Sequence, residues 1–361
     1  MKQHFQGWDV VGQHLERLAA IQGGEHWSLN AGQCASLRGI RQRIPHNGVV
    51  IADEVGMGKT RIAVALAHSV IAAGGRVAIL VPPGLGFQWH DELRDGGVDS
   101  PPLLRSLWQF LAAWDPETDE KNPWFDHKVI LISHAFTNWR LGENNAPWRW
   151  ALLPTLYGRW RKLTSGRFPN GFGHCEELDD EWVQAAACAI AETIQARPAR
   201  HPARRLLDEL CRQVSWAETL NPSGYGRGQT LRPWLESAVG LGLGIFDLVI
   251  IDEAHKSRGD HSGLSRMLDQ VVMPSDSARR LAMTATPVEL DAGQWSQILE
   301  RIGASGFGDS TTPGDIFQDY ADACARVRQC PHDTEAREAY CRLAQRFEQT
   351  LQPYVLRRDK L

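Results

Sequence analysis

The sequence lacks the features that would place the protein in a membrane or outside the cell. No apolar run approaches the roughly 20 residues that a membrane-spanning helix needs, and the first ten residues, MKQHFQGWDV, lack the apolar core of a signal peptide. The seven cysteines include no C-x-x-C pair, so we expect neither a disulfide framework nor a standard zinc site. We therefore expect a cytoplasmic protein with no membrane partner.

Excess charge of one sign is also missing. Lys and Arg number 39 against 43 Asp and Glu, which gives a formal net charge of -4 at pH 7. A chain with this balance is not attracted to polyanions as a whole, so a nucleic-acid site would have to be a local patch. What is present is an ordinary globular composition, with 43% hydrophobic and 23% charged residues over 361 positions.

Five short aliphatic runs, each bounded by turn residues, predict β-strands. They lie near residues 48–53, 76–83, 128–133, 246–252 and 279–286. Continuous apolar runs of this length are typical of parallel strands buried on both faces, and helical patterns lie between them. The sequence therefore predicts a doubly wound α/β fold, in which ligands bind beyond the carboxyl ends of the strands.

One connection is far too long for an ordinary crossover. Roughly 110 residues, 135–245, separate the third and fourth runs, whereas such connections are usually short. We expect an insertion at about 137–245, mainly helical because residues 180–196 and 203–216 have helical patterns. Residues 313–351 predict two more helices.

The stretch VVIADEVGMGKTRIAVAL at residues 49–66 has the order strand, glycine-rich turn and helix headed by Lys-Thr. Such a turn surrounds phosphate oxygens with backbone amides at a helix N-terminus. We expect Lys59 to reach the β and γ phosphates of a nucleoside triphosphate and Thr60 to ligate Mg²⁺. The residues expected to bind the nucleotide here are Glu54, Val55, Gly56, Met57, Gly58, Lys59, Thr60 and Arg61.

The G-x-x-x-x-G-K-T pattern of phosphate loops is not complete in this chain. Asp53 stands where the first glycine belongs. The alternative interpretation is a glycine-rich turn that carries an exposed lysine and binds no phosphate.

A second motif, DLVIIDEAH at residues 247–255, places two carboxylates just beyond a buried strand. Asp252 is positioned to hold the hydration shell of Mg²⁺, and Glu253 to polarise an attacking water as general base. With Lys59, these two acids form the predicted catalytic set. Two acids at the end of a strand could otherwise cap the next helix.

In this order, DEVGMGKT, DEAH and TATP resemble the N-terminal RecA-like lobe of superfamily-two helicases, and most closely the Swi/Snf-type group of DNA translocases. LNAGQ at 29–33 resembles the adenine-reading Q element of that family, and ILVPPGLGFQWHDEL at 79–93 resembles its loop along the nucleic-acid backbone. VILISHAF at 129–136 and YVLRRDK at 354–360 resemble the next strand and the segment that closes the first lobe. The resemblance covers nearly the whole chain from about residue 25, apart from the insertion.

The resemblance implies roles for residues outside the two motifs. Gln33 would contact adenine. The residues implied to couple nucleotide to movement are His255, Thr284 and Thr286, and those implied to touch nucleic acid are Pro82, Gln88 and Trp89. Trp89 could equally pack beneath the helix that follows it. The family usually has LTGTP where this chain has MTATP at 283–287, but both hydroxyls are kept.

The first part of the insertion interleaves tryptophans with basic residues. Residues 139–167 contain four Trp and six Arg or Lys against a single acid, Glu143. This pattern fits a surface that stacks and attracts exposed strands, with Arg159, Arg161 and Lys162 as contacts. Alternatively, the tryptophans form a small core of the insertion and the arginines cover it. The sequence alone leaves both interpretations open.

The resemblance divides the chain into an N-terminal helical extension, 1–24, and the RecA-like lobe, 25–361. No second RecA-like lobe with its arginine finger is found in these residues, so we expect a partner lobe, in cis or in trans, and poor ATP turnover by this chain alone. The expected function is the ATP-binding lobe of a translocase or helicase that grips duplex DNA through its phosphate backbone and is nucleoid-associated when bound. The alternatives are a nucleotide-gated interaction module that needs a partner lobe, and an RNA-directed helicase.

Overall fold

The computed structural model describes residues 4–20, 27–118, 123–142, 144–255, 263–285, 290–304 and 313–358. The chain divides into two compact units. The first unit comprises Met1–Asp99, Asp247–Gly259 and Ser277–Leu361, and the second comprises Ser100–Phe246 and Asp260–Asp276. Thr286 and Glu143 lie outside the described residues.

Six strands form a sheet in the order β3-β2-β4-β5-β1-β6. The strands are β1 (Val49–Ile51), β2 (Val77–Val81), β3 (Val129–Ser133), β4 (Ile245–Ile251), β5 (Met273–Met283) and β6 (Val355–Leu356). Strand β1 is parallel to β5, with Val50 opposite Ala282, and also parallel to β6, while β2 is parallel to β4. The prediction of a parallel α/β sheet is confirmed, and all five aliphatic runs contain strands.

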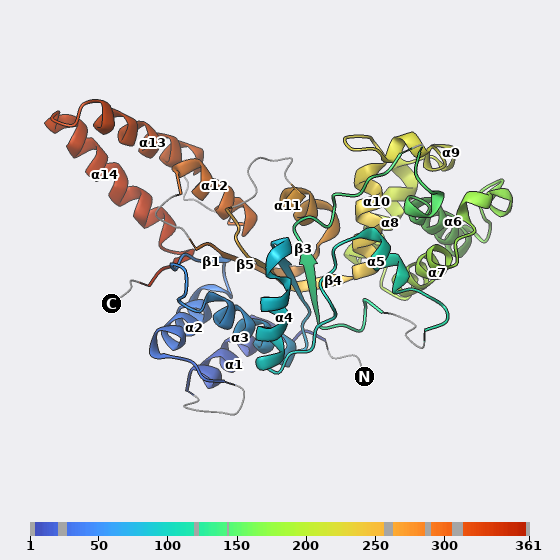
Figure 1. The fold of residues 1–361 in the computed structure, drawn as a ribbon, viewed down its shortest axis with the longest axis horizontal. Coiled ribbons are helices and arrows are strands. Elements are labelled where there is room, and N and C mark those ends of the chain that lie inside the picture. The colour runs from blue at the N-terminus through green and yellow to red at the C-terminus, as the bar shows by residue number, and fades with distance from the viewer. Residues whose placement is uncertain are drawn as a thin grey trace. The chain divides into compact units, whose positions relative to one another are not determined.

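The helices of the first unit lie on both sides of its strands (Figure 1). They are α1 (Trp8–Ala20), α2 (Ala31–Arg43), α3 (Lys59–Ala72), α4 (Gly86–Asp95), α12 (Ala292–Arg301), α13 (Pro313–Gln329) and α14 (Thr334–Leu351), and a short 3-10 turn η1 (Pro83–Leu85) precedes α4. Helix α3 buries most of its side chains, as expected for the helix that follows a central strand.

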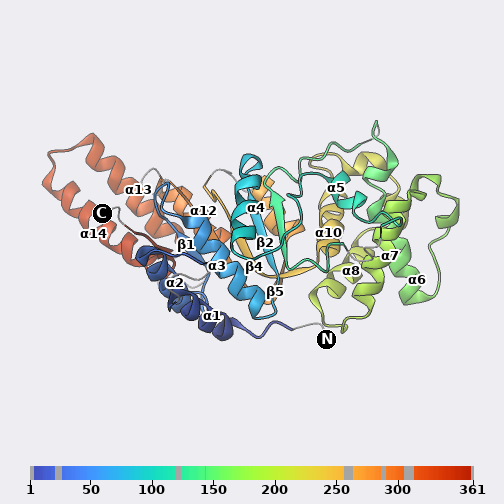
Figure 2. The same cartoon turned by 60° about the horizontal axis from the view of Figure 1, so that its bottom comes forward.

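Helices α13 and α14 are the two helices predicted for residues 313–351, and they lie side by side in both views (Figures 1 and 2). The ring of Phe347 on α14 contacts Phe317 and Tyr320 on α13, with centroid separations of 5.2 and 4.4 Å. These aromatic contacts hold the helical pair together.

The second unit is mainly helical between β3 and β4 (Figure 2). Its longer helices are α5 (Leu107–Ala112), α6 (Leu152–Ser165), α7 (Glu181–Gln195), α8 (Pro202–Gln213) and α10 (Arg232–Leu243). Its shorter elements are η2 (Pro147–Arg149), η3 (Phe172–His174), η4 (Glu176–Leu178), α9 (Trp216–Thr219), η5 (Pro222–Tyr225), α11 (Gly263–Arg266) and η6 (Met267–Val271). The helices predicted at 180–196 and 203–216 correspond to α7 and α8.

The core of the second unit is built around two tryptophans and α10. Trp150 stacks on Tyr225 with ring centroids 5.5 Å apart, and the Trp160 indole donates to Asp208 at 2.9 Å. Both tryptophans are buried, so this half of the Trp and Arg interleave packs as a small core. In the part of the chain that the structure describes, no helix is long and apolar enough to cross a bilayer.

Candidate functional site

The turn between β1 and α3, predicted to bind phosphate, contains two glycines in the left-handed backbone region. Gly56 and Gly58 have φ angles of 84° and 75°, in the left-handed region that glycine enters without steric cost. A Cβ at Gly58 would lie 2.3 Å from Nε2 of Gln33, whereas a Cβ at Gly56 would meet nothing within 4 Å. The loop therefore requires glycine at 58 for two reasons and leaves open space beside 56.

Lys59, the first residue of α3, is held at this loop. Its Nζ donates to the carbonyl oxygens of Asp53 and Glu54 at 2.7 and 2.9 Å. Burial lowers the pKa of the Lys59 ammonium, and the carboxylates of Asp53, Glu253 and Asp252 oppose that shift. The positive charge of the loop thus lies close to the two acids that follow β4.

Asp53 occupies the position where the pattern has glycine, and the structure gives the reason. Its carboxylate, 1% exposed, accepts from Nε and Nη2 of Arg358 at 2.8 and 2.6 Å and from the Arg358 backbone N–H at 2.8 Å. Nη2 also donates to the Met57 carbonyl at 2.7 Å. The Arg358 side chain therefore ties the segment after β6 to both ends of the loop. This pair was not predicted from the sequence.

Gln33 of the predicted Q element lies next to the loop and also caps α2. Its side-chain oxygen accepts from the Asn30 N–H at 2.9 Å, and Asn30 Oδ1 accepts from the Gln33 N–H at 2.8 Å. These reciprocal bonds form a capping box. They fix the Gln33 side chain and leave its amide nitrogen facing Gly58.

Asp252, directly after β4, is almost buried at 7% exposure. Its Oδ2 accepts from the Trp89 indole at 2.8 Å, and its Oδ1 accepts from the Glu253 N–H at 2.9 Å. Burial raises the pKa of the Asp252 carboxyl, and the Trp89 hydrogen bond opposes that shift. Glu253 has φ 50°, the only positive φ among the described residues other than glycine. Such strain is typical of functional sites.

The turn after β4 continues toward β5. His255 Nε2 lies 3.4 Å from Glu253 Oε2, and His255 Nδ1 lies 3.0 Å from Thr284 Oγ1. The Ala254 N–H donates to the Met283 carbonyl at 2.9 Å, and the buried guanidinium of Arg301 donates to the Ala254 carbonyl. The structure thus brings two of the three predicted coupling residues together and adds Arg301 as a support from α12. No sequence motif pointed to Arg301.

Trp89 was predicted either to touch nucleic acid or to pack under its helix. Its side chain is 1% exposed, and it packs inward with its N–H committed to Asp252. A surface contact through Trp89 is therefore wrong for this structure, because almost none of the side chain is accessible. Gln88 on the same helix is exposed and Pro82 is half-buried. Phe87 beside them is 79% exposed and was not predicted.

Arg61 also points elsewhere than at the mouth of the loop. Its Nη1 lies 3.4 Å from Glu92 on α4, and its guanidinium lies 5.1 Å from the Trp27 ring centroid. These contacts direct the side chain across α3 toward α4. The role of Arg61 as a nucleotide contact stays a prediction.

The three basic residues predicted to touch nucleic acid are carried by α6, in the second unit. Arg159 donates to Gln184 at 2.7 Å, and the Arg159 and Lys162 cations lie 5.7 and 5.6 Å from the Phe168 ring centroid. Arg161 is exposed. Two of the three cations therefore lie beside the partly exposed Phe168 ring, and Arg161 and Lys162 are both exposed. Their role as nucleic-acid contacts stays a prediction.

The first unit combines an amide-rich loop and one lysine after β1 with two carboxylates after β4, and β5 lies between these two strands in the sheet. Lys59 and the loop amides could hold phosphate oxygens, while Thr60 and Asp252 could hold Mg²⁺. Among the described residues, no group of three or more His, Cys, Asp or Glu side chains could enclose a metal alone. This donor set suits Mg²⁺, which usually takes one or two side-chain ligands with phosphate and water.

Comparison with known proteins finds similarity to Swi/Snf-type proteins. A 91-residue stretch, 24% of this chain, is 36% identical to the RNA polymerase-associated protein RapA of Pseudomonas aeruginosa (strain LESB58), of which it covers 8%. The SWI2/SNF2 ATPase core of Sulfolobus solfataricus in complex with dsDNA is similar over 92% of this chain and 44% of its own, with TM-score 0.45 and 14% identity. The SWI2/SNF2 ATPase core domain of that organism matches over 94% and 46%, with TM-score 0.44 and 12% identity. No family model matches the chain. The chain thus spans less than half the length of these proteins.

Replacing Trp89 by Phe tests the bond to Asp252. We expect the free energy of unfolding to fall by about 1–3 kcal/mol, because a buried carboxylate oxygen loses its donor, as measured by urea denaturation. The matched control is Trp108→Phe, at a side chain that is 53% exposed, where the change should stay within about 0.5 kcal/mol. In an Asp252→Ala background, Trp89→Phe should cost less. An equal cost in both backgrounds would mean that only ring volume matters.

Replacing Arg358 by Ala tests the link between Asp53 and the loop. We expect a loss of about 3–5 kcal/mol in unfolding free energy, because the buried Asp53 charge is left without its partner. Adding Asp53→Asn should recover part of that loss. Arg357→Ala is the matched control, since Arg357 is the adjacent arginine and is exposed. If both arginine variants unfold at the same denaturant concentration, the link contributes no stability.

Proposed function

We propose that this chain is the nucleotide-binding lobe of an ATP-dependent motor that moves along nucleic acid, with duplex DNA as the preferred track. The observation that carries the proposal is the convergence of the Lys59 loop, the Asp252–Glu253 pair and Thr284 beyond the carboxyl ends of β1, β4 and β5. In parallel α/β sheets this edge is where ligands bind. The resemblance of the three motifs to Swi/Snf-type translocases and the short likeness to RapA agree with this role.

Each residue of the site has a role in the proposal. A bound Mg²⁺-ATP supplies the γ-phosphoryl group that water attacks. Lys59 and the loop amides would hold phosphate oxygens, and Thr60 and Asp252 would hold Mg²⁺. Glu253 accepts the proton of the attacking water at its carboxylate. Gln33, at the edge of the loop, is the candidate for the adenine contact through its amide nitrogen.

The contacts from Glu253 through His255 to Thr284 link the site to β5. A change in the hydrogen bonding of Glu253 alters the partner of His255, which in turn contacts the residue that leads out of β5. We assign these residues to coupling between hydrolysis and movement. Trp89 is buried, so Gln88 and its exposed neighbours on α4 are the residues of this unit that we expect to contact nucleic acid.

Nucleotide affinity tests the binding part of the proposal. Titration with a fluorescent ATP analogue and Mg²⁺ should show that Lys59→Ala weakens binding roughly 10- to 150-fold, the equivalent of 1.5–3 kcal/mol for a charge-assisted bond. Lys128→Ala, at an exposed lysine of the second unit, should leave the affinity unchanged. Equal affinities for all three proteins would contradict the phosphate-loop assignment.

ATP turnover with duplex DNA, single-stranded RNA or neither tests the motor. We expect duplex DNA to stimulate turnover, and Glu253→Gln to reduce the stimulated rate by about 10²- to 10⁴-fold while ATP still binds, because the general base is lost. The assay needs a preparation in which the complementary RecA-like lobe is present. Turnover that RNA stimulates and DNA does not would replace the DNA motor with an RNA-directed helicase.

A further inference from the structure

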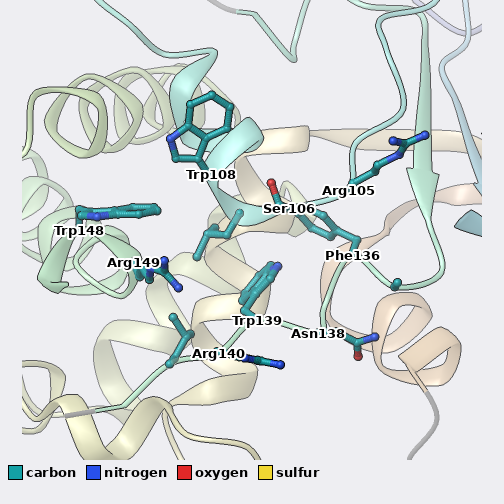
Figure 3. Close-up of a pocket in the computed structure, with 12 residues that line it drawn as sticks. Arg105, Ser106, Trp108, Phe136, Asn138, Trp139, Arg140, Trp148 and Arg149 are labelled. Atoms are coloured by element: carbon teal, nitrogen blue, oxygen red, sulfur yellow. The ribbon is translucent and has the colours of Figure 1, made fainter. Parts of the chain in front are cut away.

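The second unit contains a pocket that the nucleotide site does not use. It has a volume of about 350 Å³, within the range of small-molecule sites. Three segments form it: the start of α5, the segment that follows β3, and η2. Figure 3 shows Trp108, Trp139 and Trp148 grouped around one opening, with the Arg149 side chain between Trp148 and Trp139.

The lining combines aromatic rings with positive charge. Besides the three tryptophans, Phe136 belongs to the wall, and Arg140 and Arg149 provide cations. A third arginine, Arg105, extends away from the rings (Figure 3). Among the described residues that line the pocket there is no Asp or Glu. A ligand that matches this wall is both aromatic and anionic.

One side of the pocket is held rigidly. The Trp139 and Phe136 rings are nearly perpendicular, with centroids 5.3 Å apart, and the Arg232 guanidinium lies 4.8 Å from the Trp139 ring centroid. Arg232 is itself fixed by Glu236 at 2.8 Å and by the Thr137 carbonyl at 2.6 Å, and both charged side chains are buried. A ring clamped in this way offers a flat surface that does not have to be ordered when a ligand stacks on it.

The wall also contains unused hydrogen-bond donors. Nε1 of Trp139 and Nε of Arg149 are shielded from solvent and have no hydrogen-bond partner among the described residues. A buried donor without an acceptor costs free energy. A ligand reaches these two N–H groups only if the wall opens around them, whereas the exposed Arg140 side chain is accessible as it stands and can donate to phosphate oxygens.

At the rim, two further rings remain accessible. Trp108 is 53% exposed, and the half-buried Trp148 carries the Arg149 guanidinium 5.1 Å from its centroid. Aromatic faces next to cations are how proteins bind unpaired nucleotides, with the base on a ring and the phosphate on the charge.

We propose that this pocket binds one unpaired nucleotide, with the base against the tryptophan rings and the phosphate at Arg149 and Arg140. The proposal deepens the proposed function, because a strand that a motor separates or holds open is a source of such nucleotides. A free mononucleotide has the same chemistry and is the other source. Binding to the pocket requires no ATP, so its test is independent of the site in the first unit.

The test uses the whole chain without ATP. Fluorescence anisotropy is measured with a labelled ten-residue thymidine strand and with the same strand lacking its bases. Trp148→Ala and Arg149→Ala should each weaken binding of the thymidine strand, Trp148→Ala by about 5- to 150-fold, the range for loss of one stacked base. Arg205→Ala, at an exposed arginine of α8 outside the pocket, is the matched control. Circular dichroism melting of each variant confirms that it folds.

Cross-linking locates the bound base. A strand with one 5-iodouracil is irradiated on the chain, and trypsin then releases the peptide of residues 141–149. We expect the cross-link on this peptide, and we expect Trp148→Ala to remove it even if that variant binds the strand elsewhere. Competition by thymidine monophosphate at concentrations below those of the strand would identify the free nucleotide as the ligand.

Two results would overturn the proposal. If the strand without bases binds as tightly as the thymidine strand, the protein binds the charged backbone and does not recognise a base. If the cross-link lies on none of the tryptic peptides that contain Trp108, Trp139 and Trp148, and Trp148→Ala binds as tightly as Arg205→Ala, the nucleotide lies elsewhere. Either result leaves the ATP-binding experiments unaffected, so failure of the pocket and failure of the motor can be told apart.

Discussion

The buried carboxylate of Asp252 is the point on which the geometry of the first unit depends. It is 7% exposed. Burying an ionised carboxylate costs free energy unless its oxygens accept hydrogen bonds. One donor is the Trp89 indole of α4, and the other is the N–H of Glu253 in its strained turn. The same acid therefore fixes the position of α4 and the conformation of the proposed catalytic base. Lys59 contributes the nearby positive charge.

The contact between Trp89 and Asp252 offers a path by which nucleic acid bound at α4 could alter the proposed nucleotide site. Gln88 and Phe87 are exposed on the first turn of α4, and Trp89, the next residue, is buried against Asp252. Because the indole is close-packed, a shift of the first turn of α4 moves the donor that serves Asp252. Trp89 alone connects the exposed first turn of α4 to Asp252, the proposed metal ligand. Nothing between the two sites has to transmit the change through the sheet.

Local elements of the fold were predictable from the sequence, but the pairs that hold the site together were not. Strands β1 to β4 and helix α3 were predicted from apolar runs and from the glycines that end them, which are local signals. The pairs Trp89–Asp252 and Asp53–Arg358 join residues 163 and 305 positions apart, and no periodicity records such a contact. Asp53 in place of glycine was a visible anomaly. Its meaning depended on an arginine that only the parallel pairing of β6 with β1 brings to the loop.

The stretch that interleaves Trp and Arg, residues 139–167, also could not be divided into core and surface from the sequence. The sequence pattern was interpreted as a whole, either as a surface that stacks on bases or as a core. In the structure, different tryptophans of the stretch have different environments. Trp150 is buried against Tyr225 and Trp160 is buried with its N–H bonded to Asp208, whereas Trp139 and Trp148 line a pocket with Arg149. Along the chain, the change from the pocket to the core falls at η2, which contains Trp148 and Arg149 and is followed directly by the buried Trp150. Composition could not predict this division, because both halves need the same residue types. Since the chain carries no excess positive charge, the proposed binding of nucleic acid would have to come from such local groupings.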